Sequence, residues 1–232
     1  MENNDMNRYS YAWFLSVLTC LSVSCSGEEE HYYPSVKSEF LTGFSGADGT
    51  LQSVQTDAGT TYQILENATK TTIPADSLIR MVGSYTEATG TDGTTGVKLY
   101  GWIVAVSPFP VSPDRFKEGV KTDPADVQSI WPGLGYINII LTVKMQKALH
   151  LFHFIEDDVH VDKESGRCDV FLRLYHDAKN DVQAFTKRIY LSVPLHRYVA
   201  AEGMKQVTIH FSLNTTSGEL KTYSLNYTPP NM

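Results

Sequence analysis

From residue 36 onward, apolar and polar residues alternate with a period of two, and short groups of Gly, Asp and Asn separate the alternating runs. A period of two predicts half-buried β-strands, because successive side chains of a strand point to opposite faces. In the first part of the chain the runs cover residues 40–44, 51–56, 60–65, 78–86 and 97–107. Five short strands predict a small closed barrel, in which the sheet leaves no open edge.

The last of these runs predicts which side chains share a face of the strand. Alternation puts one apolar set on the same face: Val97, Leu99, Ile103 and Ala105. The opposite face carries Lys98, Tyr100 and Trp102. Together with Tyr85, the two aromatic residues could form a surface for stacking a sugar or an aromatic ligand, although core filling is the favoured interpretation for Trp102.

The chain changes character at residues 108–113, which contain three prolines. Prolines remove amide donors and hold the chain extended, so this segment predicts a boundary between a barrel domain at residues 37–112 and a second domain at residues 113–232. After a poorly patterned stretch that ends at Ile130, strand patterns cover residues 137–143, 148–156, 170–176, 184–195, 207–213 and 220–227. Six or seven strands predict a β-sandwich, so the whole fold is expected to be all-β.

Turn residues between these runs predict how neighbouring strands pair. Residues 170–176 and 184–195 are expected to form one hairpin, and residues 207–213 and 220–227 another. Asp157 and Asp158 are expected to form an acidic turn after residue 156, and residues 162–166 another turn. Pro194 predicts that its strand lies at a sheet edge or ends there.

The amino terminus carries an apolar run at residues 12–21 that is followed by a cysteine. The run has about half the length that a membrane-spanning helix needs, which is typical of a signal peptide that is removed, here residues 1–24. Cys25 is the favoured processing site because the small Ser24 precedes it, and Cys20 is the alternative. Translation from Met6 gives a positively charged start that translation from Met1 lacks, and cleavage as an ordinary secretory signal remains open.

Acylation of Cys25 would hold a soluble domain at a lipid bilayer without a membrane-spanning helix. Residues 25–36 would then form an acidic tether. Ser26, Glu28, Glu29 and Glu30 resemble a serine-plus-acidic signal that exports lipoproteins to the outer face of the outer membrane, and a merely solvated linker is the alternative. We expect an outer-membrane lipoprotein that faces the cell exterior.

Charge and cysteine content argue against nucleic-acid binding and against a disulfide. The chain has a net charge of −7, and residues 37–112 contain four basic and seven acidic residues. This balance argues against nucleic-acid binding, which needs clustered Lys and Arg. With Cys20 removed and Cys25 acylated, Cys168 has no disulfide partner, and its apolar strand context predicts a buried structural role.

Several segments together resemble the NigD-like lipoproteins: residues 136–143, 149–151, 170–181, 190–193 and 209–211. The likeness is strongest at the segment Leu-Arg-Leu-Tyr-His-Asp-Ala, residues 172–178, and covers most of the mature chain. The resemblance implies an OB-fold-like barrel, an immunoglobulin-like β-sandwich and an acylated cysteine. It implies no catalytic residues, since the family is of unsettled function and takes its name from a member encoded beside a bacteriocin.

Few residues of the sequence suggest a metal-binding or catalytic site. Six histidines follow Phe109, but their spacing does not form a zinc-binding motif, and the acids near Asp177 and Asp181 do not follow an EF-hand order. We therefore expect no metal, no cofactor and no enzymatic activity. Ser77 lies in an Asp-Ser-Leu triplet that matches a short O-glycosylation pattern.

Three functions remain. The first is a binding module that presents loops, such as residues 87–96, to a glycan or a protein. The second is a bacteriocin-associated self-protection factor. The third is a structural factor of the cell envelope that faces the periplasm.

Overall fold

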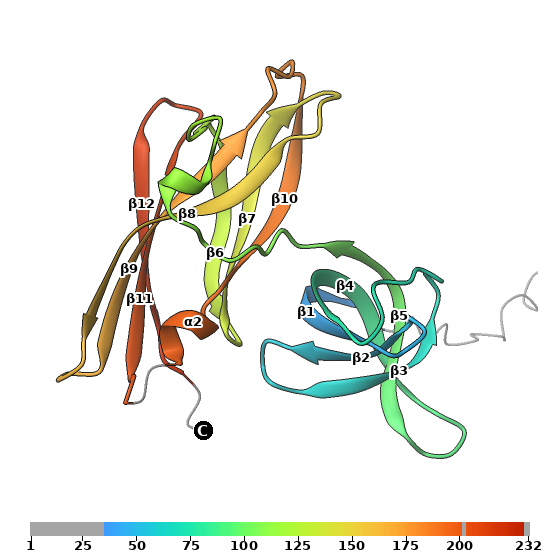
Figure 1. Cartoon of the computed structure of the whole chain (residues 1–232). Helices are drawn as coiled ribbons and strands as arrows, with labels where there is room; N and C mark the ends of the chain where they lie inside the picture. Colours follow the sequence, from blue (N-terminus) through green and yellow to red (C-terminus); the bar gives the residue numbers. More distant parts are fainter. Residues whose placement is uncertain (1–34, 201–202, 230–232) are drawn as a thin grey trace, which may run out of the picture. The chain divides into compact units, whose positions relative to one another are not determined.

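The computed structural model describes residues 35–200 and 203–229 (Figure 1). Along the chain, the strands first form a closed barrel and then two further sheets. Within the described ranges, no helix combines the length and the apolar character that crossing a bilayer requires. Cys25 and the other residues of the predicted signal, anchor and tether up to residue 34 lie outside these ranges.

The first domain is a closed barrel of five strands, which confirms the predicted barrel (Figure 1). Its strands are β1 (Lys37–Ser45), β2 (Leu51–Thr56), β3 (Thr61–Asn67), β4 (Leu78–Thr89) and β5 (Thr95–Val104). They pair in the order β1-β2-β3-β5-β4, β4 closes back onto β1, and β3 runs parallel to β5. This is the strand order of an OB fold. Apolar side chains without solvent exposure fill the centre: Leu41, Val54, Met81, Val97 and Leu99.

A β-bulge in β5 overturns one sequence prediction. Ser84 pairs with Gly101, and the next residue of β4, Tyr85, pairs with Leu99, so Tyr100 is left without a partner. One extra residue reverses the facing of every side chain that follows it. Ile103, which was predicted to share a face with Val97 and Leu99, is 60% exposed although both of those residues are buried. Trp102 packs against the barrel core, in agreement with its favoured interpretation.

The second domain is a β-sandwich of two facing sheets, as predicted (Figure 1). One sheet has the order β10-β7-β6 and contains β6 (Asp126–Gly133), β7 (Tyr136–Met145) and β10 (Phe185–Pro194). The other has the order β12-β11-β9-β8 and contains β8 (Leu151–Asp162), β9 (Arg167–Asp177), β11 (Gln206–Asn214) and β12 (Leu220–Tyr227). Two short helices accompany them, η2 (Pro113–Arg115) and α2 (His196–Val199). Inward residues of both sheets form one core that includes Ile139, Leu141, Phe154, Leu172 and Phe211.

Two turn predictions in this domain are wrong. β9 and β10 do not form a hairpin, because β9 pairs with β8 and runs parallel to β11, while β10 pairs with β7 in the other sheet. The connection between β9 and β10 therefore crosses from one sheet to the other. Asp157 and Asp158 do not form a turn either, because β8 runs on to Asp162 and accommodates the acidic pair with a bulge.

Other predictions hold. β11 and β12 form the predicted hairpin, residues between Asp162 and Arg167 turn, and β10 ends at Pro194. β6 begins in the stretch that showed no clear pattern, where a register shift between Val127 and Ser129 interrupts its alternation.

Candidate functional site

A buried ion cluster joins the barrel to the sandwich, and we call it the Arg80 node. Arg80 of β4 donates through Nη2 to both carboxylate oxygens of Asp57, at 2.7 and 2.8 Å, and to Oδ1 of Asn138 at 2.9 Å. Its Nε donates to Oγ of Ser192 at 3.0 Å, and its Nη1 donates to Oγ1 of Thr42 at 3.2 Å. The Arg80 side chain is only 3% exposed, so its charge is compensated within the protein.

The partners of Arg80 come from both domains. Thr42 and Asp57 belong to the barrel, whereas Asn138 lies on β7 and Ser192 on β10. Asn138 also donates to Asp57, at 2.6 Å, and Ser192 donates to Asn138, at 2.8 Å. The desolvation of a buried charge is offset only where an opposite charge and further hydrogen bonds are well placed around it. The node therefore fixes how the end of the barrel meets the sandwich.

The segment between the domains forms backbone hydrogen bonds with both sheets of the sandwich. The N–H of Val106 donates to the carbonyl of Tyr190, and the carbonyl of Val106 accepts from the N–H of Ser192, so Val106 pairs with β10. Five residues later, Val111 exchanges the same kind of bonds with Phe154 and Glu156 of β8. The linker thus closes part of one side of the sandwich.

Beside this covered part lies an open apolar depression of about 230 Å³, which we call the junction groove. Three of its side chains are strongly exposed: Leu149 at 81%, Ile103 at 60% and Val104 at 53%. The remaining lining residues are Val106, Met145, His150, Phe152, Arg188, Ile189 and Tyr190. The groove therefore offers apolar surface with one guanidinium and one imidazole among its walls.

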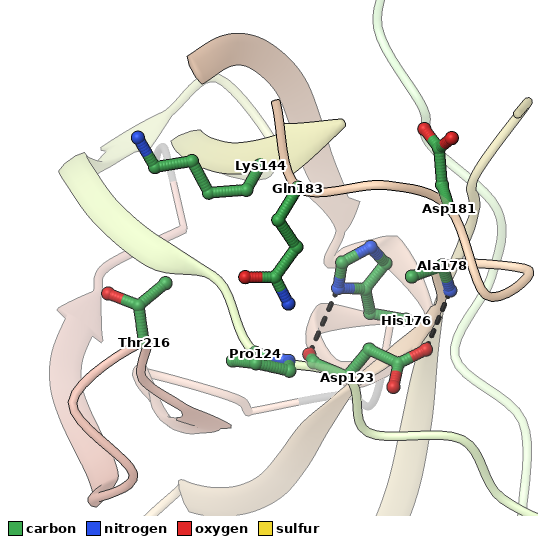
Figure 2. A pocket seen from close by; sticks show the side chains of 8 residues that line it. All are labelled: Asp123, Pro124, Lys144, His176, Ala178, Asp181, Gln183 and Thr216. Carbon is green, nitrogen blue, oxygen red and sulfur yellow. Dashed lines mark hydrogen bonds between the residues drawn. The ribbon is translucent and has the colours of Figure 1, made fainter. Parts of the chain in front are cut away.

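A second, polar pocket of about 170 Å³ lies at the connection between β9 and β10 (Figure 2). Figure 2 shows His176 with its Nδ1 directed at the carbonyl of Asp123, 2.9 Å away, and the N–H of Ala178 directed at the Asp123 carboxylate, 2.7 Å away. Lys144, Gln183 and other side chains complete the lining. The carbonyl and carboxylate of Asp123 are thus already occupied by the protein itself.

His176 also forms a buried pair with His150. Nε2 of His176 lies 2.9 Å from Nδ1 of His150. Because the Asp123 carbonyl can only accept, Nδ1 of a neutral His176 carries the proton, its Nε2 accepts, and His150 donates. Burial lowers the pKa of His176, and the nearby His150 lowers it further, so the neutral form is favoured.

The far nitrogen of His150 has no hydrogen-bond partner among the described residues, although the side chain is only 1% exposed. This Nε2 lies 3.4 Å from the carboxylate of Asp181. Backbone amides, led by that of Gln146, donate to Asp181 and hold its pKa well below the usual range. His150 also lines the junction groove, so the histidine pair connects the groove to the polar pocket.

The outer face of the four-stranded sheet carries aromatic and acidic side chains around a shallow depression of about 600 Å³. The ring of Phe171 stacks on His210, with centroids 4.6 Å apart, and meets His160 edge-on. Each of these histidines lies next to a carboxylate, His210 to Asp169 and His160 to Asp158. These groups are paired with one another, which leaves fewer of them free for a ligand than in the junction groove.

The structure describes only some of the residues singled out from the sequence. Cys20, Cys25, Ser26 and Glu28 to Glu30 lie outside the described residues. Ser77 is half-buried and donates to the Pro74 carbonyl at 2.6 Å, and its glycosylation stays a prediction. Cys168 is buried, as predicted, and burial raises its pKa.

Sequence reasoning missed both polar clusters. His150 was discounted because its spacing from His153 fits no metal motif, yet it lies just before β8 and its partner is His176 of β9. Among the described residues, no three His, Cys, Asp or Glu side chains are grouped so that they could hold a metal ion.

Comparison with known proteins connects this architecture to a family. Residues 107–227 match the NigD-like C-terminal beta sandwich domain. The crystal structure of a NigD-like immunity protein from Bacteroides caccae is 32% identical, covers 86% of this chain and 100% of that one, and superimposes with a TM-score of 0.70.

More distant structures share the fold alone. A protein of unknown function from Bacteroides vulgatus is 16% identical, covers 85% of this chain and 92% of that one, and has a TM-score of 0.62. A protein named as a lipoprotein from Bacteroides fragilis is 13% identical, covers 85% of this chain and 100% of that one, and has a TM-score of 0.59. Among curated proteins, none matches the chain significantly.

Proposed function

The chain belongs to the NigD-like family, and from that premise we propose that it is a lipid-anchored protein of the cell exterior that binds a protein partner through the junction groove. The binding is non-catalytic. The apolar run at residues 12–21, the cysteine at position 25 and the lipoprotein name of a structural neighbour support the anchor. Ser26 and the three glutamates at 28–30 support the outward orientation.

The observation that carries the proposal is the exposed apolar surface of the junction groove. Single exposed apolar residues are ordinary, but a contiguous apolar depression typically marks a recognition site. Ile103, Val104 and Leu149 meet in such a depression, and the Arg80 node holds the barrel side and the sandwich side in fixed positions. A preorganised surface loses little conformational entropy on binding.

The chemistry of the groove favours a protein over a glycan. Sugars need several hydrogen-bonding groups that converge on their hydroxyls, whereas this lining offers few polar side chains, chiefly Arg188 and His150. Apolar walls with an isolated cation suit an aliphatic or aromatic side chain that is accompanied by a carboxylate.

Site-specific photocrosslinking in intact cells tests the proposal. A photoreactive residue in place of Leu149 should give a discrete adduct with one protein, identified by mass spectrometry. The same residue in place of Leu220, which is exposed on β12, is the matched control and should give none. Equal adducts at both positions, or no adduct at either, would refute groove binding.

The anchor and its orientation need separate measurements. Labelled palmitate should enter the wild-type protein and not the Cys25→Ala variant, and protease added to whole cells should degrade the wild-type protein. Protein that is cut only after lysis would refute exposure at the cell exterior.

A second candidate function rests on the immunity protein of B. caccae, which is similar over its entire length. This chain could protect its own cell from a bacteriocin. A deletion strain should then lose tolerance to culture supernatants of bacteriocin-producing strains, and restoring the gene should return it. Unchanged tolerance would exclude this function.

A further inference from the structure

One half of the β10 edge is covered and the other half is open. Tyr190 and Ser192 of β10 exchange backbone hydrogen bonds with Val106 of the linker, on the side that faces away from β7. Alternate residues of a strand direct their backbone groups to the same side. Thr186 and Arg188 therefore direct their N–H and C=O groups to this side as well, and within the described residues no strand pairs with them there.

The junction groove lies along this open half. Arg188, Ile189 and Tyr190 belong both to β10 and to the groove wall. On the opposite wall, Phe152 belongs to β8, the edge strand of the other sheet, and Leu149 lies just before that strand begins. An unpaired strand edge and an apolar depression thus occupy the same place.

We propose that Phe185–Ile189 of β10 is a strand-addition site, which takes an extended peptide segment of the protein partner as a further strand. The inference rests on the proposed function and specifies how the groove binds. Free backbone groups of Thr186 and Arg188 supply main-chain hydrogen bonds, and the groove supplies specificity through alternate side chains. The linker already uses this mode of pairing at Val106.

The groove also defines the sequence character of that segment. An extended strand presents every second side chain to the same face, about 6.6 Å apart. One such side chain, aliphatic or aromatic, would contact Leu149 and Ile103. A carboxylate nearby would pair with Arg188, whose Nε donates to Gln128 at 2.9 Å and whose side chain is solvent-exposed.

Charge argues against a second copy of the chain as the added strand. Pairing two β10 edges would bring Lys187 and Arg188 of one copy close to the same residues of the other. Like charges at facing strand positions are destabilising, and lysine at an edge is a common protection against such pairing. An acidic and apolar segment from a different protein meets no such repulsion.

A peptide selection tests the inference on the full mature chain with Cys25→Ser. The probe is a library of random linear 12-residue peptides displayed on phage. Enriched peptides are labelled with fluorescein and titrated against the chain and against Leu149→Ser, which identifies the peptides that use the groove. We expect these peptides to combine alternating apolar residues with an acid, and to weaken several-fold when Arg188 is replaced by Ala.

The decisive pair of variants is Thr186→Pro and Thr186→Ala. Both lose the threonine hydroxyl and its bond from Lys144, but only proline removes the backbone donor, and proline is tolerated at strand edges. We expect Thr186→Pro to weaken binding at least tenfold and Thr186→Ala to weaken it less than threefold. Equal effects of the two substitutions on a groove-dependent peptide would overturn strand addition while leaving groove binding intact.

Amide hydrogen exchange followed by NMR tests strand addition without any substitution. In the free chain the amides of Thr186 and Arg188 should exchange rapidly, and the bound peptide should protect them. Lys187 and Ile189, which face β7, should be protected in both states. Failure to find any groove-dependent peptide would also overturn the inference, whereas the proposed function is judged separately by crosslinking from Leu149.

Discussion

The two buried polar clusters of this protein differ in how completely their hydrogen bonds are satisfied. In the Arg80 node, the guanidinium, the Asp57 carboxylate and the Asn138 amide all find partners at ordinary distances. In the histidine pair, Nε2 of His150 finds none among the described residues and lies near the carboxylate of Asp181.

This difference suggests that the Arg80 node has a structural role, whereas the energy of the histidine pair depends on protonation. A fully satisfied network rigidifies its surroundings, as the node does where barrel and sandwich meet. A partly satisfied one changes its energy with the protonation of its members and with whatever occupies the adjoining space. The histidine pair borders the junction groove, so a partner bound in the groove would change its surroundings.

Removing Arg80 should have the largest effect. Arg80→Met keeps the volume but leaves the carboxylate of Asp57 without its charge partner, so the free energy of unfolding should fall by about 3 kcal/mol. Urea unfolding followed by tryptophan fluorescence measures this change. The exposed Arg188→Ala is the control and should stay within about 0.5 kcal/mol of wild type. Similar stability of both variants would contradict the structural role of the node.

Replacing His176 should have a smaller effect. His176→Phe removes the donor to the Asp123 carbonyl and the acceptor for His150, so the free energy of unfolding should fall by about 1–3 kcal/mol. His160→Gln is the matched control, because its pair with Asp158 is exposed and contributes little. Thermal unfolding of both variants compares them, and equal melting temperatures would refute the predicted importance of the buried pair.

The histidine pair should also make stability depend on pH. The folded pKa of His176 lies below the unfolded value of 6.5, so the unfolded chain binds more protons between the two values. The stabilisation is therefore complete above about pH 6.5 and declines as the pH falls through the folded pKa. Urea midpoints between pH 7.5 and 5 should fall in the wild type and fall less in His176→Phe. Parallel curves would assign the pH dependence to other groups.

Changing the groove itself should alter stability least. Leu149 is almost fully exposed, so Leu149→Ser should change the free energy of unfolding by less than about 0.5 kcal/mol. The matched buried substitution Leu141→Ser should cost several kcal/mol, since Leu141 has no solvent exposure. A large loss of stability in Leu149→Ser would show that this residue packs rather than binds.

Local patterns predicted the strands well where one face is buried. Ile137, Ile139, Leu141 and Val143 alternate along β7, and all four are buried. The same reasoning failed for Ile103, because the bulge at Tyr100 depends on the pairing of β5 with β4 and not on β5 alone. The turn residues after β9 led to the wrong prediction of a hairpin between β9 and β10. A turn within one sheet and a connection that crosses between sheets contain the same residue types.

The clusters escaped prediction for a related reason. Arg80, Asp57 and Asn138 are brought together by the meeting of two domains, and nothing in their local sequence signals it. His150 and His176 meet because β8 pairs with β9, and that register follows from the whole sheet. Side chains far apart in the sequence become a site only through tertiary pairing.

The parallel alignment of β9 with β11 also has a consequence for folding kinetics. Arg167 pairs with Gln206, and β10 lies between them in the sequence but joins the other sheet. Such distant pairing requires a long loop to close first, and folds rich in it typically mature in milliseconds to seconds. We expect a newly made chain to spend that interval with unpaired strand edges, when aggregation competes most strongly with maturation.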